Sequence, residues 1–332
     1  MNSAGGSFLD RLAAGEVLLA DGAMGSLLME HGLESGQPPE RFNLEHPELL
    51  QEIARAYLEA GAQILQTNTF GGSPLKLAPY GLAERTEQIQ REAVGAVRAA
   101  IAVAGRETDR VLEFTDVEAA GGGAERARRG GVVYISGSCG PCGRMLEPYG
   151  DASPALVRES FERQMGALID AGIDILCIET MTDLQEARLA VEAAHRAMTA
   201  ISRRVPVMTS MTYDATPRGF FTMMGQDIAT CAAALLESGT DIVGSNCGNG
   251  IVNMVKIAQE LRAVTDRPLL IQSNAGLPEL EGDRAVYRED PDFMAGHIPA
   301  LCEAGVQVIG GCCGTTPDHI RAFRRALDEL TS

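Results

Sequence analysis

The stretch A-L-C-E-A-G-V-Q-V-I-G-G-C-C at residues 300–313 has three counterparts elsewhere in the chain, and the four copies together decide the fold. The others are A-Y-L-E-A-G-A-Q-I-L-Q-T-N-T at 56–69, A-L-I-D-A-G-I-D-I-L-C-I-E-T at 167–180 and A-L-L-E-S-G-T-D-I-V-G-S-N-C at 234–247. Each copy reads as the end of an amphipathic helix, a glycine that ends it, and a short apolar strand. Strands without alternating polarity are typical of parallel strands buried on both faces.

Four further apolar segments lie between or before the repeats. They are V-L-L-A-D at 17–21, V-V-Y-I-S-G-S at 132–138, V-P-V-M-T-S at 205–210 and P-L-L-I-Q-S at 268–273. With the four repeat strands they give eight strands, each followed by a helix and spaced roughly as the units of a barrel are. A doubly wound open sheet shares this pattern, but eight nearly even units favour an α/β fold of the closed (β/α)8, or TIM-barrel, type.

The length of the chain and the segments between the repeats indicate its domain organisation. We expect residues 1–332 to form a single (β/α)8 barrel domain. The interval between the first two repeats holds surplus chain near 105–131, which is polar and rich in glycine. We expect this surplus to be a surface insertion.

Composition excludes several classes of protein. Hydrophobic residues make up 45% and charged residues 22%, as in an ordinary globular domain. A net charge of −17 argues against nucleic acid as a partner. No signal peptide or membrane-spanning run is visible, so we expect a cytoplasmic protein with no membrane partner. In that compartment the eight cysteines are expected to be buried residues, metal ligands or catalytic thiols, and not a disulfide framework.

Polar and thiol side chains follow the repeat strands at matching positions. These are Asn68 and Thr69, Glu179 and Thr180, Asn246 and Cys247, and Cys312 and Cys313. Reactive groups in such barrels sit at the carboxyl ends of the strands, so these side chains are expected to meet at one rim. Packing alone does not require this arrangement.

Three of these residues suggest a metal site. Cys247 ends the sixth strand, and the pair Cys312–Cys313 ends the eighth, flanked by glycines that allow both thiols to point at one ion. Three thiolates suit Zn²⁺ and leave a fourth position open for a substrate. The alternative is that the cysteines are small core residues. We assign Cys177, Cys231 and Cys302 to that role.

Another cysteine pair lies in S-C-G-P-C-G at 138–143. Cys139 and Cys142 form a Cys-x-x-Cys motif of the kind found in thioredoxin-type redox sites. The motif follows the third strand and lies among glycines, which instead favours a loop shaped for close approach of its backbone to a ligand.

The motifs together resemble the homocysteine S-methyltransferase family. They are G-G-C-C-G at 310–314, S-N-C-G at 245–248, D-G-A-M-G at 21–25, Q-T-N-T-F-G at 66–71, I-E-T at 178–180 and N-A-G-L-P at 274–278. The resemblance runs over nearly the whole chain and looks closest to the N-terminal, homocysteine-binding module of cobalamin-dependent methionine synthase. The surplus near 105–131 and the cysteines in 138–143 depart from the family pattern.

This resemblance implies one Zn²⁺ per chain, held by Cys247, Cys312 and Cys313, with the homocysteine sulfur as the fourth ligand. It also implies that Asp21 and Glu179 hold the amino-acid end of homocysteine. By the same resemblance, Asn274 is a candidate ligand when substrate is absent. Asn68 and Asn246 either orient substrate or satisfy backbone groups at strand ends.

The function expected from these observations is methyl transfer to the thiolate of L-homocysteine, which gives methionine. The methyl donor is expected to be a methyl-corrinoid on another module or chain, with neither cobalamin nor folate bound by this chain alone. A sulfonium or betaine donor is an alternative, although few aromatic residues are present to enclose a quaternary ammonium group. In a second alternative, the chain is a non-catalytic, zinc-stabilised subunit of a larger methyltransferase.

Overall fold

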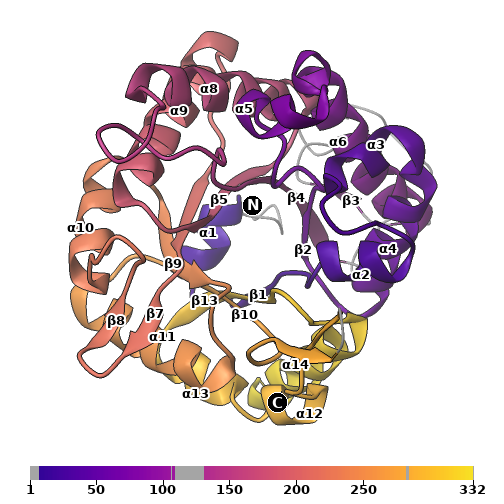
Figure 1. The fold of residues 1–332 in the computed structure, drawn as a ribbon. Helices are drawn as coiled ribbons and strands as arrows, with labels where there is room; N and C mark the ends of the chain where they lie inside the picture. Colours follow the sequence, from indigo (N-terminus) through magenta and orange to yellow (C-terminus); the bar gives the residue numbers. More distant parts are fainter. Residues whose placement is uncertain (1–6, 106, 109–130, 282–283, 332) are drawn as a thin grey trace, which may run out of the picture.

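The computed structural model describes residues 7–105, 107–108, 131–281 and 284–331. Its principal feature is a ring of parallel strands surrounded by helices, the (β/α)8 architecture expected from the repeats (Figure 1). The strands of the ring, in chain order, are β1 (Leu18–Leu19), β2 (Ile64–Gln66), β4 (Val132–Cys139), β5 (Ile175–Met181), β6 (Val207–Met211), β9 (Ile242–Asn246), β10 (Leu269–Ser273) and β13 (Val306–Gly311). These match the strands predicted from the sequence.

The ring closes between its first strand and its neighbours on either side. β1 pairs in parallel with β13, with Leu18 opposite Val308. On the other side Ala20 forms a parallel bridge with Ile64, and the Gln63 N–H donates to the carbonyl of Leu19 at 2.7 Å. The sheet therefore has the closure that distinguishes a barrel from a doubly wound sheet.

Helices form the outer layer. They are α2 (Gly25–Glu30), α3 (Phe42–Glu45), α4 (Pro47–Glu59), α5 (Pro74–Leu77), α6 (Thr86–Val103), α8 (Pro154–Ala171), α9 (Leu184–Ile201), α10 (Ile228–Glu237), α11 (Ile251–Val264), α12 (Pro291–Ala295), α13 (Ile298–Glu303) and α14 (Pro317–Leu330). Short 3-10 turns lie at Pro39–Arg41, Ala78–Tyr80 and Ala83–Arg85. None of the helices within the described residues combines the length and hydrophobicity that a bilayer crossing requires.

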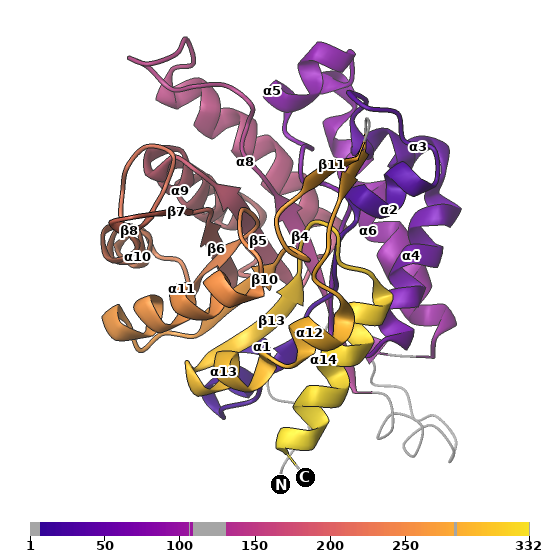
Figure 2. The same cartoon turned by 60° about the horizontal axis from the view of Figure 1, so that its bottom comes forward.

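Two hairpins project from the carboxyl ends of the strands. One is formed by β7 (Asp214–Thr216) and β8 (Gly219–Phe221), and the other by β11 (Glu279–Glu281) and β12 (Arg284–Val286). Figure 2 shows the second hairpin beside the end of β13. The insertion expected near 105–131 lies largely outside the described residues, apart from β3 (Glu107–Thr108), which pairs with the start of β4.

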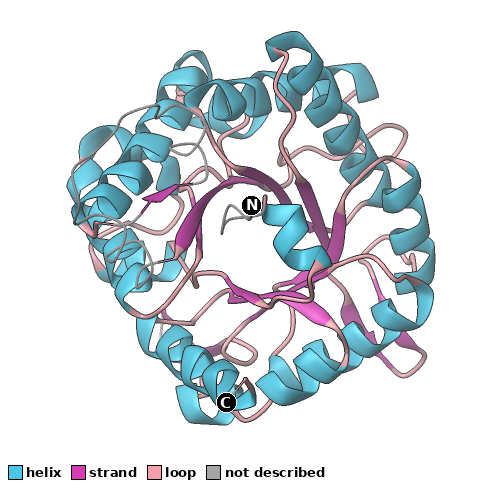
Figure 3. Ribbon diagram, turned by 180° about the vertical axis from the view of Figure 1, so that it is seen from behind, coloured by secondary structure: helices cyan, strands magenta, loops and turns pink. Residues whose placement is uncertain are grey.

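The opposite end of the barrel is covered by α1 (Phe8–Ala13), as Figure 3 shows from behind. Phe8 and Leu12 are buried in the cluster that fills the barrel interior, and the Phe8 ring meets Tyr134 edge-on, with centroids 5.0 Å apart. A separate and larger apolar core lies between the strands and the outer helices. Packing thus fills the amino end of the barrel and leaves the carboxyl end for the site.

Candidate active site and metal centre

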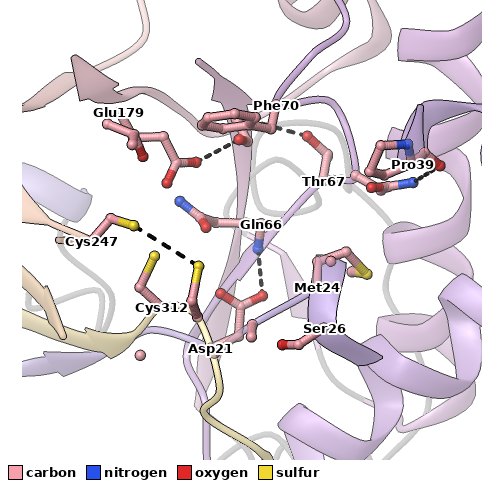
Figure 4. A pocket seen from close by; sticks show the side chains of 18 residues that line it. Asp21, Met24, Ser26, Pro39, Gln66, Thr67, Phe70, Glu179, Cys247 and Cys312 are labelled. Atoms are coloured by element: carbon pink, nitrogen blue, oxygen red, sulfur yellow. Dashed lines mark hydrogen bonds between the residues drawn. The ribbon is translucent and has the colours of Figure 1, made fainter. Parts of the chain in front are cut away.

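A cavity of about 240 Å³ opens at the carboxyl ends of the strands. Its wall combines residues in the last part of, or directly after, β1, β2, β4, β5, β9 and β13. Figure 4 shows Cys247 and Cys312 on one side, with Glu179 and Asp21 facing the space around Gln66. Residues that are far apart in the sequence therefore meet at the rim, as the repeat positions predict.

Three cysteines form the sulfur-rich wall of this cavity. The Sγ atoms of Cys247, Cys312 and Cys313 all lie within 4.8 Å of one another, and those of Cys247 and Cys313 are 3.9 Å apart. Cys247 has a φ of +59°, a left-handed backbone conformation that is unfavourable for residues other than glycine. The strand end therefore carries backbone strain at the residue whose thiol turns toward the other two.

The turn that carries the adjacent cysteines depends on Gly311. A Cβ atom added there would lie 2.2 Å from Oγ1 of Thr315. That hydroxyl donates to the carbonyl of Cys312 at 2.7 Å and accepts from the Ala23 N–H at 3.1 Å. Gly311 thus lets Thr315 pack against the chain and hold the carbonyl of Cys312, which belongs to the peptide bond between the two cysteines.

Asp21 contributes a buried carboxyl group with one unused oxygen. Its side chain is 3% exposed; Oδ2 accepts from the Gln66 N–H at 2.8 Å, and Oδ1 has no hydrogen-bond partner among the described residues. Burial raises the pKa of Asp21 to about 8, against the lowering effect of the Gln66 N–H, and the charge of Glu179 adds to the rise. A buried acceptor without a partner is a natural place for a cationic group to bind.

Glu179 is the second buried carboxyl group of the cavity. Oε1 accepts from the Ser138 hydroxyl at 2.5 Å, and Oε2 accepts from the Asn246 amide at 3.3 Å. Burial raises the pKa of Glu179 to about 7; the Ser138 bond lowers it, and the neighbouring Cys247 raises it. With Asp21, it gives the cavity two carboxyl groups whose ionised forms need a nearby positive charge.

Asn246 lies behind the cavity wall and is fully buried. Its Oδ1 accepts from the Thr180 N–H and the Ser210 hydroxyl, each at 2.7 Å. Its amide group donates to Glu179 and lies 3.8 Å from the Cys312 sulfur. Of the two alternatives for this residue, these contacts favour holding strand ends and site residues in place.

Asn68 makes a similar set of internal bonds at the end of β2. Its amide donates to the carbonyl of Pro39 at 2.8 Å and to Oδ1 of Asn43 at 2.9 Å. Asn43 donates in return to the Asn68 carbonyl at 2.8 Å. The amide group of Asn68 is thus bonded to Pro39 and Asn43, although the residue lines the cavity.

Comparison with known proteins adds the family to this geometry. Residues 18–327 match the family model described as homocysteine S-methyltransferase. The chain belongs to the homocysteine S-methyltransferase family. This membership confirms the family resemblance drawn from the sequence motifs.

Two curated relatives of the chain are methionine synthases. The protein of Mycobacterium leprae is 32% identical over 324 residues, which are 95% of this chain and 24% of the relative. That of Mycobacterium tuberculosis is 32% identical over 323 residues, or 95% of this chain and 25% of the relative. The chain thus spans about a quarter of the length of the curated relatives it matches.

The fold is shared with a solved homocysteine methyltransferase, MmuM from Escherichia coli. Its metallated form superposes with a TM-score of 0.73 at 24% identity, covering 95% of this chain and 98% of that one. The structural likeness supports the barrel fold. Because the sequence identity is low, the roles of individual residues are argued from the present structure.

The homocysteine S-methyltransferase family implies zinc, and the residues present fit such an ion. Three sulfurs within 4.8 Å of one another are a donor set that Zn²⁺ accepts in tetrahedral sites. Asn274 stands beside them: its side chain lies near Cys247, and its buried Oδ1 has no partner among the described residues. The arrangement supplies three sulfur donors and a polar oxygen nearby, at the wall of the cavity.

The second cysteine pair has a different environment. Cys139 and Cys142 are fully buried; the Cys139 thiol donates to Gln164 at 3.1 Å, and the Cys142 N–H donates to Glu186 at 2.7 Å. Burial raises the pKa of the Cys139 thiol well above its usual range and that of Cys142 to about 12. Because thiolates are the reactive species, a redox role is disfavoured.

The close approach expected of the 138–143 loop is made to an aromatic side chain. A Cβ atom at Gly140 would lie 2.4 Å from the ring of Phe70, and the Gly140 N–H donates to the Phe70 carbonyl at 2.8 Å. This contact holds Phe70 at the wall of the cavity, where 39% of the residue stays exposed.

Two site residues were missed by the sequence analysis, namely Ser138 and Gln66. Ser138 was passed over as part of the cysteine motif, but its hydroxyl fixes Glu179. The Gln66 side chain lies near Glu179, while its backbone N–H donates to Asp21. Their place at the ends of two predicted strands was the available signal.

Proposed function

We propose that this chain moves a methyl group to the sulfur of L-homocysteine to give methionine. Residues 1–332 act as a single homocysteine-binding barrel domain in this proposal. The observation that carries it is the meeting of three thiols and two buried carboxyl groups at one cavity on the open end of the barrel. Family membership supplies the reaction class, and the cavity supplies a place for the acceptor.

Cys247, Cys312 and Cys313 are the residues that would hold one Zn²⁺. When bound, the ion would supply the acidity that converts a substrate thiol to a thiolate at neutral pH. The rim places these sulfurs at the wall of the cavity, so an amino acid held there can present its own sulfur beside them. Asn274 is the further candidate ligand when no substrate is present.

Asp21 and Glu179 bind the amino-acid end of homocysteine in this proposal. Each is buried, and no Lys, Arg or His of the described part of the chain offsets its charge, so the substrate ammonium group is favoured between them. Ser138 and Asn246 keep Glu179 oriented toward the cavity. Holding the ammonium end fixes the sulfur end, which raises the effective concentration of nucleophile and methyl donor.

The transfer itself is a displacement at carbon. The thiol proton leaves to water at the open end of the cavity, and an electron pair of the sulfur forms the new bond to the methyl carbon. The bond between that carbon and the donor breaks, and its electron pair stays with the donor. The chain contributes by orienting the acceptor and keeping the path of the donor clear.

A methyl-corrinoid carried by another module or chain is the donor that we propose. A corrinoid macrocycle is too large for a cavity of about 240 Å³ and would have to approach from the open rim. Among the described residues that line the cavity, Phe70 is the single aromatic one, which gives little support to a cage for betaine. The curated methionine synthases, of which this chain matches a quarter, are long enough to hold further modules.

The decisive experiment measures zinc content and sulfur coordination with and without homocysteine. We expect one zinc per chain and a change from three to four sulfur neighbours by X-ray absorption. Parallel assays with methylcobalamin, S-methylmethionine, betaine and S-adenosylmethionine then identify the donor. Normal zinc content with no response to homocysteine would favour a non-catalytic zinc-stabilised subunit and overturn the proposal.

Replacement of one cysteine by mutation tests the same proposal. Cys312→Ala is expected to lose zinc and methyl transfer while keeping the circular dichroism spectrum of the folded barrel. Full turnover by this variant would contradict the assignment of Cys312.

A further inference from the structure

We propose that Tyr287 and Glu289 are positioning residues for the three thiols. They lie in the short segment, residues 287–289, that leaves the β11–β12 hairpin and passes over both thiol-bearing loops. The inference rests on the metal-binding role proposed above and adds to it the parts that hold the cysteines in place. Neither residue was singled out by the sequence motifs.

Tyr287 contacts the loop that follows β13. A Cβ atom at Gly314 would lie 2.2 Å from Cγ of Tyr287, so the aromatic ring packs directly on the residue next to Cys313. Gly314 has a φ of +79°, which a glycine adopts without strain. This packing brings the Tyr287 hydroxyl near the Cys313 sulfur, and a phenol hydroxyl can donate to a thiolate.

Glu289 contacts the loop that follows β9. The first residue of α11 is Ile251, and its N-cap, Gly250, has no side chain to accept a hydrogen bond from the helix. Glu289 fills this role from another segment, because its Oε2 accepts from the Ile251 N–H at 2.9 Å. A carboxylate is also favoured by the positive end of the helix dipole.

Gly250 is required for this contact. A Cβ atom there would lie 2.2 Å from Oε1 of Glu289. Because only three residues separate Cys247 from Ile251, fixing the start of the helix fixes the loop that begins at the strained Cys247. A strained conformation persists only where its surroundings hold it, and Glu289 is part of that surrounding structure.

Backbone bonds anchor the segment between the two loops. The Glu289 N–H donates to the carbonyl of Ala275 at 3.0 Å, and the Ala275 N–H donates to the carbonyl of Cys313 at 3.0 Å. One chain of bonds therefore joins Glu289, the loop after β10 and the cysteine pair.

His319 of α14 fixes the same segment from the other side. Its Nδ1 accepts from the Thr316 N–H at 3.1 Å, which leaves the proton on Nε2 for donation to the Glu289 carbonyl at 3.0 Å. The segment is thus bonded to α11, α14 and the loop after β10. Groups that orient metal ligands typically change metal affinity 10- to 100-fold when they are removed.

The first test compares two helix-capping carboxylates. Glu289→Ala is expected to raise the zinc dissociation constant about 10- to 100-fold in competition with a chromophoric chelator. Asp227→Ala is the matched control: Asp227 caps α10 by accepting from the Thr230 N–H at 2.7 Å, and α10 carries none of the three thiols. Its melting temperature should fall comparably while its zinc affinity stays unchanged. Equal zinc affinities in Glu289→Ala and wild type, or equal losses in both variants, would overturn the inference.

A double-mutant cycle tests whether Gly250 acts through Glu289. Gly250→Ala should weaken zinc binding in the wild-type chain, because the new methyl group displaces the carboxylate. In the Glu289→Ala background the same change should have little further effect, since the displaced group is already absent. Equal losses in both backgrounds would show that the two residues act separately and would contradict the proposed contact.

Tyr287→Phe isolates the hydroxyl from the ring. The variant keeps the packing on Gly314, so its melting temperature should match that of wild type. In the cobalt-substituted protein, its sulfur-to-metal charge-transfer band should shift, whereas Tyr80→Phe, at an exposed site, should leave the band unchanged. An unshifted band in Tyr287→Phe would remove this residue from the proposal. Failure of the wild-type protein to bind zinc would instead overturn the proposed function itself.

Discussion

Asn246 shows how a single side chain can organise this site. Its oxygen accepts from the Thr180 N–H and the Ser210 hydroxyl, and its amide donates to the Thr180 hydroxyl at 2.7 Å. The same amide reaches Glu179 and the Cys312 sulfur. One fully buried residue therefore joins three strands, and it contacts both a carboxyl group and a thiol of the cavity.

Asn246→Ala is expected to destabilise the metal-free protein by about 3 kcal/mol, because it leaves the Thr180 N–H and the buried Ser210 hydroxyl without an acceptor. The free energy of unfolding in urea checks this value. Asn253→Ala is a control, since Asn253 is only partly buried and bonds to a neighbouring side chain. A loss below about 1 kcal/mol for Asn246→Ala would mean that water replaces these bonds.

Asp21 makes the stability of the metal-free protein depend on pH. Its pKa in the folded state is about 8, against a reference value of 3.8, so folding favours the protonated form. This contribution to stability is complete below about pH 4 and is lost as the pH rises through 8. The loss should amount to a few kcal/mol in wild type relative to Asp21→Asn, which carries no charge. Parallel pH profiles of unfolding free energy for the two proteins would contradict the shifted pKa.

At the scale of elements, the loop after β4 shows how a motif can indicate the wrong chemistry. Cys-Gly-Pro-Cys has the spacing of a redox site, but the thiols of Cys139 and Cys142 point into packed surroundings. The glycine serves the approach of Phe70, and the residue before the first cysteine, Ser138, bonds to Glu179. The spacing of the two cysteines identified a loop near the site. Their burial shows that the loop supports Phe70 and Glu179 and does not present reactive thiols.

The double variant Cys139→Ser/Cys142→Ser is expected to keep methyl transfer within about twofold of wild type, because neither thiol reaches the cavity. A stability loss of about 1–3 kcal/mol follows from the exchange of buried sulfur for a more polar hydroxyl. In the folded wild-type protein both thiols should also resist a disulfide-forming thiol reagent. Loss of turnover together with rapid thiol labelling would restore the redox interpretation.

At the scale of the whole molecule, the repeats predicted the barrel because each glycine marks the same step from helix to strand. The equivalent positions after Gly239 and Gly305 also placed Cys247 and the cysteine pair at one rim. The sequence could not give the partners of Asn68, which depend on how the loop carrying Pro39 folds back. The place of Tyr287 and Glu289 beside the thiols could not be read from the sequence, because a hairpin brings them there.

The two ends of the barrel divide stability from chemistry, and Phe8 allows this division to be tested. Phe8 is 2% exposed and fills the amino end of the barrel against Tyr134, while the three thiols lie at the carboxyl end. Phe8→Ala should lower the free energy of unfolding by about 3–5 kcal/mol, the usual effect of removing a buried aromatic ring. Zinc and homocysteine affinities, measured well below the melting temperature, should stay at their wild-type values. If Phe8→Ala instead weakened the binding of zinc or homocysteine while the free energy of unfolding stayed unchanged, the amino end of the barrel would be shown to shape the site.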